Sequence, residues 1–401
     1  MKKLFLAAYI LYLPFQLKLP QIPVINTLNI FFILLCVIFI IGHNPKAIRA
    51  KFEAPLLIFL GLWAMSFVHA LFYIGDFWKL ELAVNFKRII TPVMGYFVFS
   101  RCIKTEKELN FLFHIFLFTV ALVGLHTLRG GMLAGPHFAD FKRSSGPFGV
   151  DWKGSDIAGG FLATFTPYLL AFTLLSKNKK LKLLTAIGLI FCVMGTLATY
   201  SRGSILALGI ASIITALLTI KQLLKTSKIT AIAILLVFFA LAIKWQAWVP
   251  ESIIHRAEET VQEDGGLYDA PELDQSTQGR INAWKTGMEI FKTNPLIGVG
   301  FKIPEYMLSY DTHSAYIQIL AEMGIFAILA FSWFLLNILR QAGALLNTKF
   351  SVIGSGAIGF IAAFLIVNMF YSNFFRDTVV GTFWVMLGIL ASCKSYAIQQ
   401  E

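Results

Sequence analysis

The chain has 401 residues, of which 57% are apolar and only 14% are charged. Soluble domains carry roughly 45–50% apolar and about 25% charged residues, so this composition excludes an ordinary soluble globular protein. The high apolar content also excludes a disordered chain, and four cysteines are too few for a disulfide scaffold of this length. The composition therefore predicts an all-α polytopic membrane protein.

Apolar residues lie in unbroken runs that are long enough to cross the hydrocarbon core as helices. We predict a transmembrane bundle of twelve spans that forms a single membrane domain over residues 1–401. The first and fourth segments are the shortest, and each is interrupted by a proline, Pro14 and Pro92. The predicted spans run approximately over residues 4–17, 22–42, 54–72, 89–100, 111–128, 157–175, 183–200, 204–220, 229–243, 316–339, 350–370 and 380–393.

The formal net charge of +12 is distributed unevenly along the chain. If the N-terminus is cytoplasmic, the segments on that side hold 18 of the 34 basic residues and only four of the 22 acidic ones. An excess of Lys and Arg in short cytoplasmic loops is typical of multi-pass membrane proteins. The charge therefore indicates orientation and does not indicate a nucleic-acid partner. Because the number of spans is even, both termini are predicted to be cytoplasmic.

Two loops on the opposite side are longer than the rest. One covers residues 129–156, and the other covers residues 244–315 and holds half of the 22 acidic residues. Within the second loop, residues 278–292 place apolar side chains at helical spacing, which predicts a helix across the outer mouth of the bundle. Asn294-Pro295 and Gly298-Val299-Gly300 should end this helix. Its apolar stripe consists of Ile281, Trp284, Met288 and Phe291.

Three polar positions on this side are candidates for function, although each also has a simpler interpretation. Arg202 lies in a short turn between the seventh and eighth spans, where an arginine often extends its charge to the membrane surface. Arg280 opens the predicted loop helix, where a solvated surface residue is common. His313 stands at the entry to the tenth span, where a histidine is more often a helix-start residue than a catalyst. Singly, none of the three establishes a site.

In combination, the stretches around these residues resemble the O-antigen ligase and polymerase superfamily. The residues that carry the resemblance are Tyr200-Ser201-Arg202-Gly203-Ser204, Gly279-Arg280-x-x-x-Trp284, Asn294-Pro295-Leu296-x-Gly298-x-Gly300 and His313-x-x-Tyr316-x-Gln318-x-Leu320-x-Glu322-x-Gly324. The loop Ser145-Gly146-Pro147-Phe148-Gly149 is similar to a glycine-containing loop of the family. The N-terminal third matches only in its pattern of spans. One departure is Ser314, since many members have Asn at this position.

The resemblance implies a multi-pass glycosyltransferase of the bacterial inner membrane whose active site faces the periplasm. Its partners would be an undecaprenyl-diphosphate-linked glycan as donor, lipid A–core or another glycan as acceptor, and membrane lipids. Chain length favours ligation to lipid A–core. A repeat-unit polymerase and a protein O-oligosaccharyltransferase remain open alternatives because they need the same chemistry. A secondary transporter is the non-enzyme alternative, although the spans lack acidic residues at mid-membrane depth.

Transfer from a lipid diphosphate builds negative charge on phosphate oxygens as the glycosidic bond breaks. No DxD motif occurs in the outer loops, so we expect neither a metal nor another cofactor. Arginine is the alternative because it stays charged and binds phosphate through two parallel hydrogen bonds. We therefore predict that Arg202 and Arg280 hold the diphosphate. His313 is the predicted general base that deprotonates the acceptor, with inversion at the anomeric carbon, or else a residue that binds the sugar or diphosphate.

Six further residues are weaker candidates for substrate binding. Lys87 and Arg88, at the predicted outer start of the fourth span, and Arg143 could contact the same anion. Tyr316 or Asp311 could support His313. Trp284 belongs to the motif that contains Arg280.

Overall fold

The structure is a computed structural model that describes residues 2–16, 27–44, 49–133, 143–149, 152–226, 261–262, 272–273, 275–308 and 312–398. The first nine helices are α1 (Lys2–Phe15), α2 (Thr27–Gly42), α3 (Glu53–Tyr73), α4 (Asp76–Ile90), α5 (Val93–Arg101), α6 (Glu106–Leu133), α7 (Trp152–Leu175), α8 (Lys179–Ala198) and α9 (Arg202–Thr226). Two short antiparallel strands follow, β1 (Val261–Gln262) and β2 (Glu272–Leu273). The remaining elements are α13 (Gln275–Thr293), α14 (Ile303–Leu308), α15 (Ala315–Leu345), α16 (Ser351–Phe370), the 3-10 helix η1 (Asn373–Phe375) and α17 (Asp377–Ile398).

Within the described residues, nine candidate spans are long and apolar enough to cross a membrane, and the shorter helix α2 is also apolar. This confirms the predicted all-α polytopic fold. Eleven of the twelve predicted segments fall on described helices. The twelfth, residues 229–243, lies outside the described residues.

The predicted start of the fourth span is wrong. The helical region begins at Asp76, and α4 and α5 together form one candidate span that ends at Arg101. The apolar criterion missed α4 because charged residues interrupt its sequence. Lys87 and Arg88 therefore lie in the last turn of α4, in the interior of this span, and not at its outer start.

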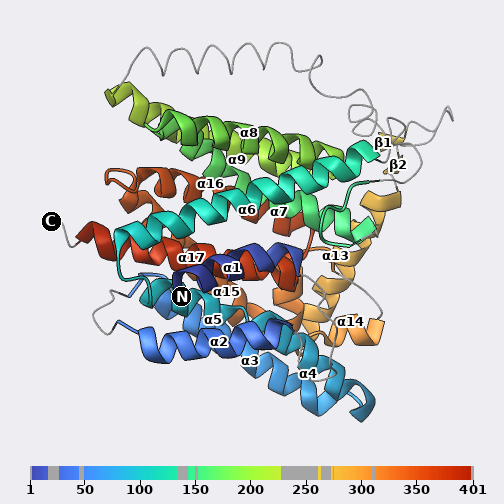
Figure 1. Cartoon of the computed structure of the whole chain (residues 1–401). Helices are drawn as coiled ribbons and strands as arrows, with labels where there is room; N and C mark the ends of the chain where they lie inside the picture. The colour runs from blue at the N-terminus through green and yellow to red at the C-terminus, as the bar shows by residue number, and fades with distance from the viewer. Residues whose placement is uncertain are drawn as a thin grey trace.

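The long helices run side by side and form a bundle with two distinct ends (Figure 1). Helices α13 and α14 and the two strands gather at one end, which we call the α13 end, and both chain termini lie toward the other, which we call the terminal end. In the bundle, α7 packs against α8, α9 and α16, while α15 packs against α3 and α16. The connections between α8 and α9 and between α16 and α17 consequently meet at the α13 end.

Small residues allow α6 and α8 to approach closely. A Cβ atom on Gly124 would come within 2.8 Å of the Cys192 backbone nitrogen, and one on Gly188 would lie 2.8 Å from the Ala121 Cβ. Close contact at small residues is a common way for membrane helices to pack, because lipid offers no hydrophobic driving force. The two helices therefore form a fixed support for the loops at their ends.

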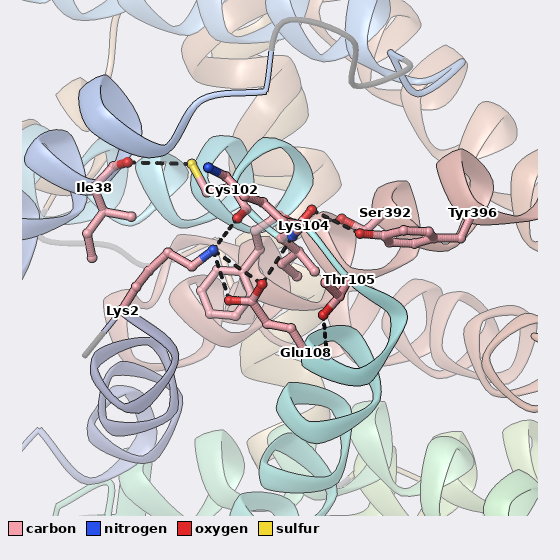
Figure 2. A network of polar contacts seen from close by, with 10 residues as sticks. Lys2, Ile38, Cys102, Lys104, Thr105, Glu108, Ser392 and Tyr396 are labelled. Atoms are coloured by element: carbon pink, nitrogen blue, oxygen red, sulfur yellow. Dashed lines mark hydrogen bonds and ion pairs between the residues drawn. The ribbon is translucent and has the colours of Figure 1, made fainter. Parts of the chain in front are cut away.

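Polar contacts at the terminal end join the first, sixth and last helices (Figure 2). Lys2 forms an ion pair with Glu108 at 2.9 Å and donates to the Cys102 carbonyl. The Glu108 carboxylate also accepts from the Lys104 backbone N–H at 3.0 Å, and the Tyr396 hydroxyl donates to the Ile103 carbonyl at 3.1 Å. These contacts show that several predicted cytoplasmic segments lie at the same end of the bundle.

Helix α15 is interrupted near the α13 end. Gly324 has φ 76° and ψ −171°, a conformation that is essentially restricted to glycine. The Ile325 backbone N–H donates to the Pro295 carbonyl at 2.9 Å instead of to a carbonyl of its own helix. A non-helical loop is thus inserted beside a break in a membrane helix, where another backbone satisfies the freed polar groups.

The inserted loop, residues 294–300, is the turn predicted to end the loop helix. Val299 and Gly300 donate their backbone N–H groups to the carbonyls of Ala321 and Glu322 at 2.9 and 3.0 Å. A Cβ atom on Gly298 would lie 2.3 Å from the Glu322 carbonyl carbon, so only glycine fits there. These bonds fix the end of α13 to α15.

Candidate functional site

The turn between α8 and α9 contains only Thr199, Tyr200 and Ser201. Tyr200 has φ 52°, a left-handed conformation that non-glycine residues seldom adopt. Arg202 is the first residue of α9, and its side chain is half-buried. A Cβ atom on the next residue, Gly203, would lie 3.0 Å from the Phe370 ring, so the start of α9 is in close contact with the end of α16.

An ion pair holds the loop after α6 against this turn. Arg143 pairs with Asp156 of α7, and its Nε donates to the Thr199 carbonyl at 2.8 Å. The side chains are 17% and 9% exposed, so the pair is largely removed from water. The next residue, Ser144, donates its backbone N–H to the Ala198 carbonyl at 3.1 Å. The loop therefore contacts Thr199, the first residue of the turn, and Ala198, the last residue of α8.

Tyr371, directly after α16, lies at the centre of a polar cluster. The other members of this cluster are Arg143, Asp156, Ser201, Ser204 and Arg280. Its hydroxyl accepts a hydrogen bond from Ser201 Oγ at 3.0 Å, and the Ser201 and Ser204 hydroxyls lie 2.8 Å apart. The guanidinium carbon of Arg280 lies 5.2 Å from the centroid of the Tyr371 ring. Burial and the Asp156 carboxylate raise the pKa of the Tyr371 hydroxyl, while Arg280 opposes this shift. The phenol is consequently neutral near pH 7.

Helix α13 extends the predicted helix by three residues at its start and one at its end. Over residues 277–293, whose burial is described, Ala283 and Gly287 are buried, whereas all four residues of the predicted apolar stripe are only half-buried. A Cβ atom on Gly287 would lie 2.3 Å from Ile317 Cγ2, so the α13 backbone rests on the first turn of α15. On the same helix, the Trp284 ring lies 6.5 Å from that of Phe370.

His313 lies in the short segment before α15 and has φ 50°. Thr312 donates its hydroxyl to the Ser314 carbonyl at 3.1 Å, which closes a tight turn around the histidine. The Ser314 hydroxyl lies 3.5 Å from the Asn368 carbonyl of α16. The residue that departs from the family pattern thus contacts the same helix end that carries Tyr371.

The structure brings the segments of all three predicted catalytic residues to the α13 end, around the end of α16. Arg280 contacts Tyr371, and Arg202 follows Ser201, which bonds to Tyr371. His313 is flanked by Ser314, which contacts Asn368. Such an arrangement can present two guanidinium groups and one imidazole to a single anionic substrate.

Residues 187–332 match the family model described as O-antigen ligase. This match supports the resemblance to the O-antigen ligase and polymerase superfamily that the sequence motifs carry. Comparison with curated proteins gave no match. The segment with superfamily similarity contains Arg202, Arg280 and His313, whereas Arg143 and Tyr371 lie outside it.

The structure gives physical reasons for several of the superfamily motif residues. Gly298 and Gly324 allow the loop and α15 to approach at the helix break. In the last motif, Gln318 Nε2 donates to Glu322 Oε1 at 2.9 Å inside α15. The Ser66 hydroxyl of α3 donates to the Glu322 carbonyl at 2.7 Å. These motif residues build the support for the site.

The weaker candidates differ in their placement. Lys87 and Arg88 are exposed on α4, where neighbouring side chains contact α14, as Asn85 does by donating to the Tyr306 hydroxyl at 2.9 Å. The Tyr316 hydroxyl donates to the Leu365 carbonyl of α16 at 2.8 Å. Asp311 lies outside the described residues.

Sequence reasoning missed Tyr371, Asn368 and Asp156. The first two lie in Asn368 to Asn373, a stretch of mixed polar and apolar residues at the junction of two strongly apolar helices. Such a stretch was a usable signal, although a connection between two spans is usually polar. Asp156 carried no local signal, because only the folded loop brings it to Arg143.

Among the described residues, no group of three or more His, Cys, Asp or Glu side chains is placed to hold a metal ion. The positive groups of the cluster are instead guanidinium groups from separate parts of the chain. Arginine is suited to phosphate because its planar group donates two parallel hydrogen bonds. Asp156 supplies a carboxylate to the cluster and pairs with Arg143, while Arg202 and Arg280 are of a type suited to binding an anion such as phosphate.

Proposed function

We propose that this protein is an O-antigen ligase-type glycosyltransferase that moves a glycan from undecaprenyl diphosphate to an acceptor hydroxyl of lipid A–core. The observation that carries the proposal is the convergence of Arg280 and the turn before Arg202 on Tyr371, in a chain whose residues 187–332 match the O-antigen ligase family model. The reaction needs positive charge where the donor diphosphate sits and a base near the acceptor. The cluster offers both kinds of group.

We also propose that the α13 end faces the periplasm of a bacterial inner membrane. The ion pairs of Lys2 with Glu108, Arg101 with Glu53 and Lys349 with Glu106 lie at the terminal end. Basic residues concentrate on the cytoplasmic side of membrane proteins. The predicted cytoplasmic segments, to which Lys2 and Lys349 belong, hold 18 of the 34 basic residues, which supports a cytoplasmic terminal end. In this proposal the donor diphosphate binds at the opposite membrane surface.

In the proposed reaction, Arg202 and Arg280 bind the diphosphate oxygens through charge-assisted hydrogen bonds. His313 removes the proton from the acceptor hydroxyl as its oxygen attacks the anomeric carbon. The bond between this carbon and the phosphate oxygen breaks, polyprenyl diphosphate leaves, and the anomeric centre is inverted. The guanidinium groups stabilise the charge that grows on the leaving oxygens, so no metal ion is required.

The remaining residues have supporting roles in this proposal. Arg143 holds the α8–α9 turn through Thr199 and Asp156. Tyr316 attaches the first turn of α15 to α16 and thereby helps to fix His313. Trp284 packs beside Phe370 and keeps α13 at the end of α16.

The test uses purified protein in lipid nanodiscs, supplied with a polyprenyl-diphosphate-linked glycan and lipid A–core. Arg280→Ala and His313→Ala, made separately, should each lower the rate of glycan transfer roughly 100-fold or more, since each removes a group that acts on developing charge or on the transferred proton. Lys285→Ala is the matched control because Lys285 is exposed on α13, and it should transfer at the wild-type rate.

Transfer that survives both substitutions would show that the site is assigned wrongly. The product identifies the acceptor. Glycan attached to lipid A–core is the expected product, whereas longer glycan on the polyprenyl carrier in its place would show a polymerase. Movement of a solute across the bilayer with no glycan transfer would show a transporter.

A further inference from the structure

Tyr371 occupies an unusual position between two spans. It follows the last residue of α16, its own backbone is extended, and its N–H still donates to the Val367 carbonyl at 2.9 Å. The side chain is only 6% exposed although it lies at the end of the bundle. It is therefore packed inside the cluster and is not an aromatic residue of the membrane surface.

The following turn holds Tyr371 in place. Phe374 of η1 inserts among aromatic side chains of the core, with its ring 5.8 Å from that of Trp63 and 5.2 Å from that of Phe331. Its backbone N–H donates to Asn368 Oδ1 at 2.8 Å. Fixed on both sides, Tyr371 has little freedom to move with a ligand.

The face of the ring contacts Arg280. A guanidinium group within about 6 Å of a ring centroid is attracted by the negative face of the aromatic system, and the observed distance is 5.2 Å. Stacking on a flat ring also restricts the directions in which the donors of a planar guanidinium group can point. The ring can therefore hold Arg280 in one orientation before a substrate arrives.

The hydroxyl of the same residue contacts the turn that precedes Arg202, the other proposed diphosphate ligand. Ser201 donates to it at 3.0 Å, and Ser201 immediately precedes Arg202. Ser201 is itself 1% exposed, so water does not compete for this bond. One side chain thus touches both segments that carry the proposed diphosphate ligands.

We propose that Tyr371 is a positioning residue that sets the distance and orientation between Arg280 and Arg202, with its ring acting on Arg280 and its hydroxyl acting on the Arg202 turn. This inference rests on the proposed function, because it assigns the spacing of the two arginines to binding of a diphosphate. The two parts of the side chain act on different arginines, so they can be tested separately.

The experiment measures the dissociation constant of a polyprenyl diphosphate for four variants: Tyr371→Phe, Tyr371→Leu, Arg280→Ala and the double variant Arg280→Ala with Tyr371→Leu. Tyr371→Leu should weaken binding roughly 2- to 30-fold, the range of cation–π interactions. Tyr371→Phe keeps the ring and should lose less. In the Arg280→Ala background, Tyr371→Leu should lose much less than it does alone, since the ring then has no guanidinium group to hold.

Equal losses from Tyr371→Leu in both backgrounds would overturn the positioning role, because the two effects would then be independent. Tyr306→Leu is the control for general loss of an aromatic residue at this end, since Tyr306 contacts Asn85 of α4. It should leave the dissociation constant unchanged. If Arg280→Ala binds the diphosphate as tightly as wild type, Arg280 is not a diphosphate ligand and the proposed function is wrong on this point. That result is distinct from failure of the positioning role.

A second measurement does not depend on the ligand. The rate at which phenylglyoxal modifies Arg280, followed by peptide mass spectrometry, reports how well the ring shields the guanidinium group. Tyr371→Leu should raise this rate severalfold, while Tyr371→Phe and Tyr306→Leu should leave it near the wild-type value. The same rate in Tyr371→Leu and wild type would show that the ring does not hold Arg280, whatever the ligand binding.

Discussion

At the scale of single residues, the pair of Arg143 and Asp156 determines how the site is supported. Removing one partner of a buried ion pair leaves an uncompensated charge and costs about 3–5 kcal/mol, although the whole pair contributes little net stability. Arg143 also satisfies the Thr199 carbonyl in a turn that contains the strained Tyr200. Its guanidinium group is thus already occupied by the protein itself.

We therefore expect Arg143→Ala to lower the thermal midpoint of the protein by several degrees. Adding Asp156→Asn should recover part of the loss, because it removes the charge that Arg143→Ala leaves unpaired. Thermal unfolding monitored by a tryptophan signal measures both effects. If Arg143→Ala leaves stability unchanged and instead weakens donor binding, Arg143 is a ligand of the substrate and not a support of the turn.

At the scale of elements, the break in α15 couples the loop helix to the bundle. The loop after α13 supplies hydrogen bonds to α15 at Ala321, Glu322 and Ile325. Gly287 brings the middle of α13 onto Ile317, four residues after His313. The position of Arg280 relative to His313 is consequently set at two points. One is Gly287 within α13, and the other is the loop of residues 294–300 directly after α13.

Gly324→Ala should destabilise the protein strongly. The backbone conformation of Gly324 alone should cost about 1–3 kcal/mol for any other residue, and the new Cβ would lie 2.3 Å from the Leu296 carbonyl oxygen. Gly343→Ala, in the same helix with nothing within 4 Å of the added Cβ, is the matched control and should be neutral or stabilising. Comparable midpoints of unfolding for the two variants would contradict the observed break in α15.

At the scale of the whole molecule, the two ends of the bundle differ in which polar residues they bring together. Ion pairs between Lys or Arg and Glu join helices at the terminal end, including Lys2 with Glu108 and Lys349 with Glu106. At the α13 end, arginines lie beside aromatic and hydroxyl groups, as Arg280 does beside Tyr371. Ion pairs and cation–π contacts occur at both ends, since Arg143 pairs with Asp156 at the α13 end and Lys3 lies over the Phe111 ring at the terminal end. The α13 end is distinguished by the convergence of Arg280 and the Ser201 hydroxyl on one residue, Tyr371.

The sequence predicts features that depend on hydropathy or on a local motif, and it does not predict features that depend on contacts made only in the folded chain. Most spans were predictable because their hydropathy alone determines that they cross the bilayer, whereas α4 was not, since it contains charged residues. Arg202, Arg280 and His313 could be selected because they lie in motifs that resemble those of a known superfamily. Tyr371 had only the weak signal of polar residues between two apolar helices, and Asp156 had none. Their importance comes from contacts with Arg280, 91 positions before Tyr371, and with Arg143, 13 positions before Asp156.

We propose above all that Arg202 and Arg280 together hold a lipid diphosphate beside His313. An experimental structure of the protein in nanodiscs with bound polyprenyl diphosphate tests it most directly. We predict phosphate oxygens within hydrogen-bonding distance of both guanidinium groups, about 2.7–2.9 Å, with the His313 imidazole facing the place where the sugar attaches. A diphosphate bound away from both arginines, or arginines that open into separate cavities, would contradict it.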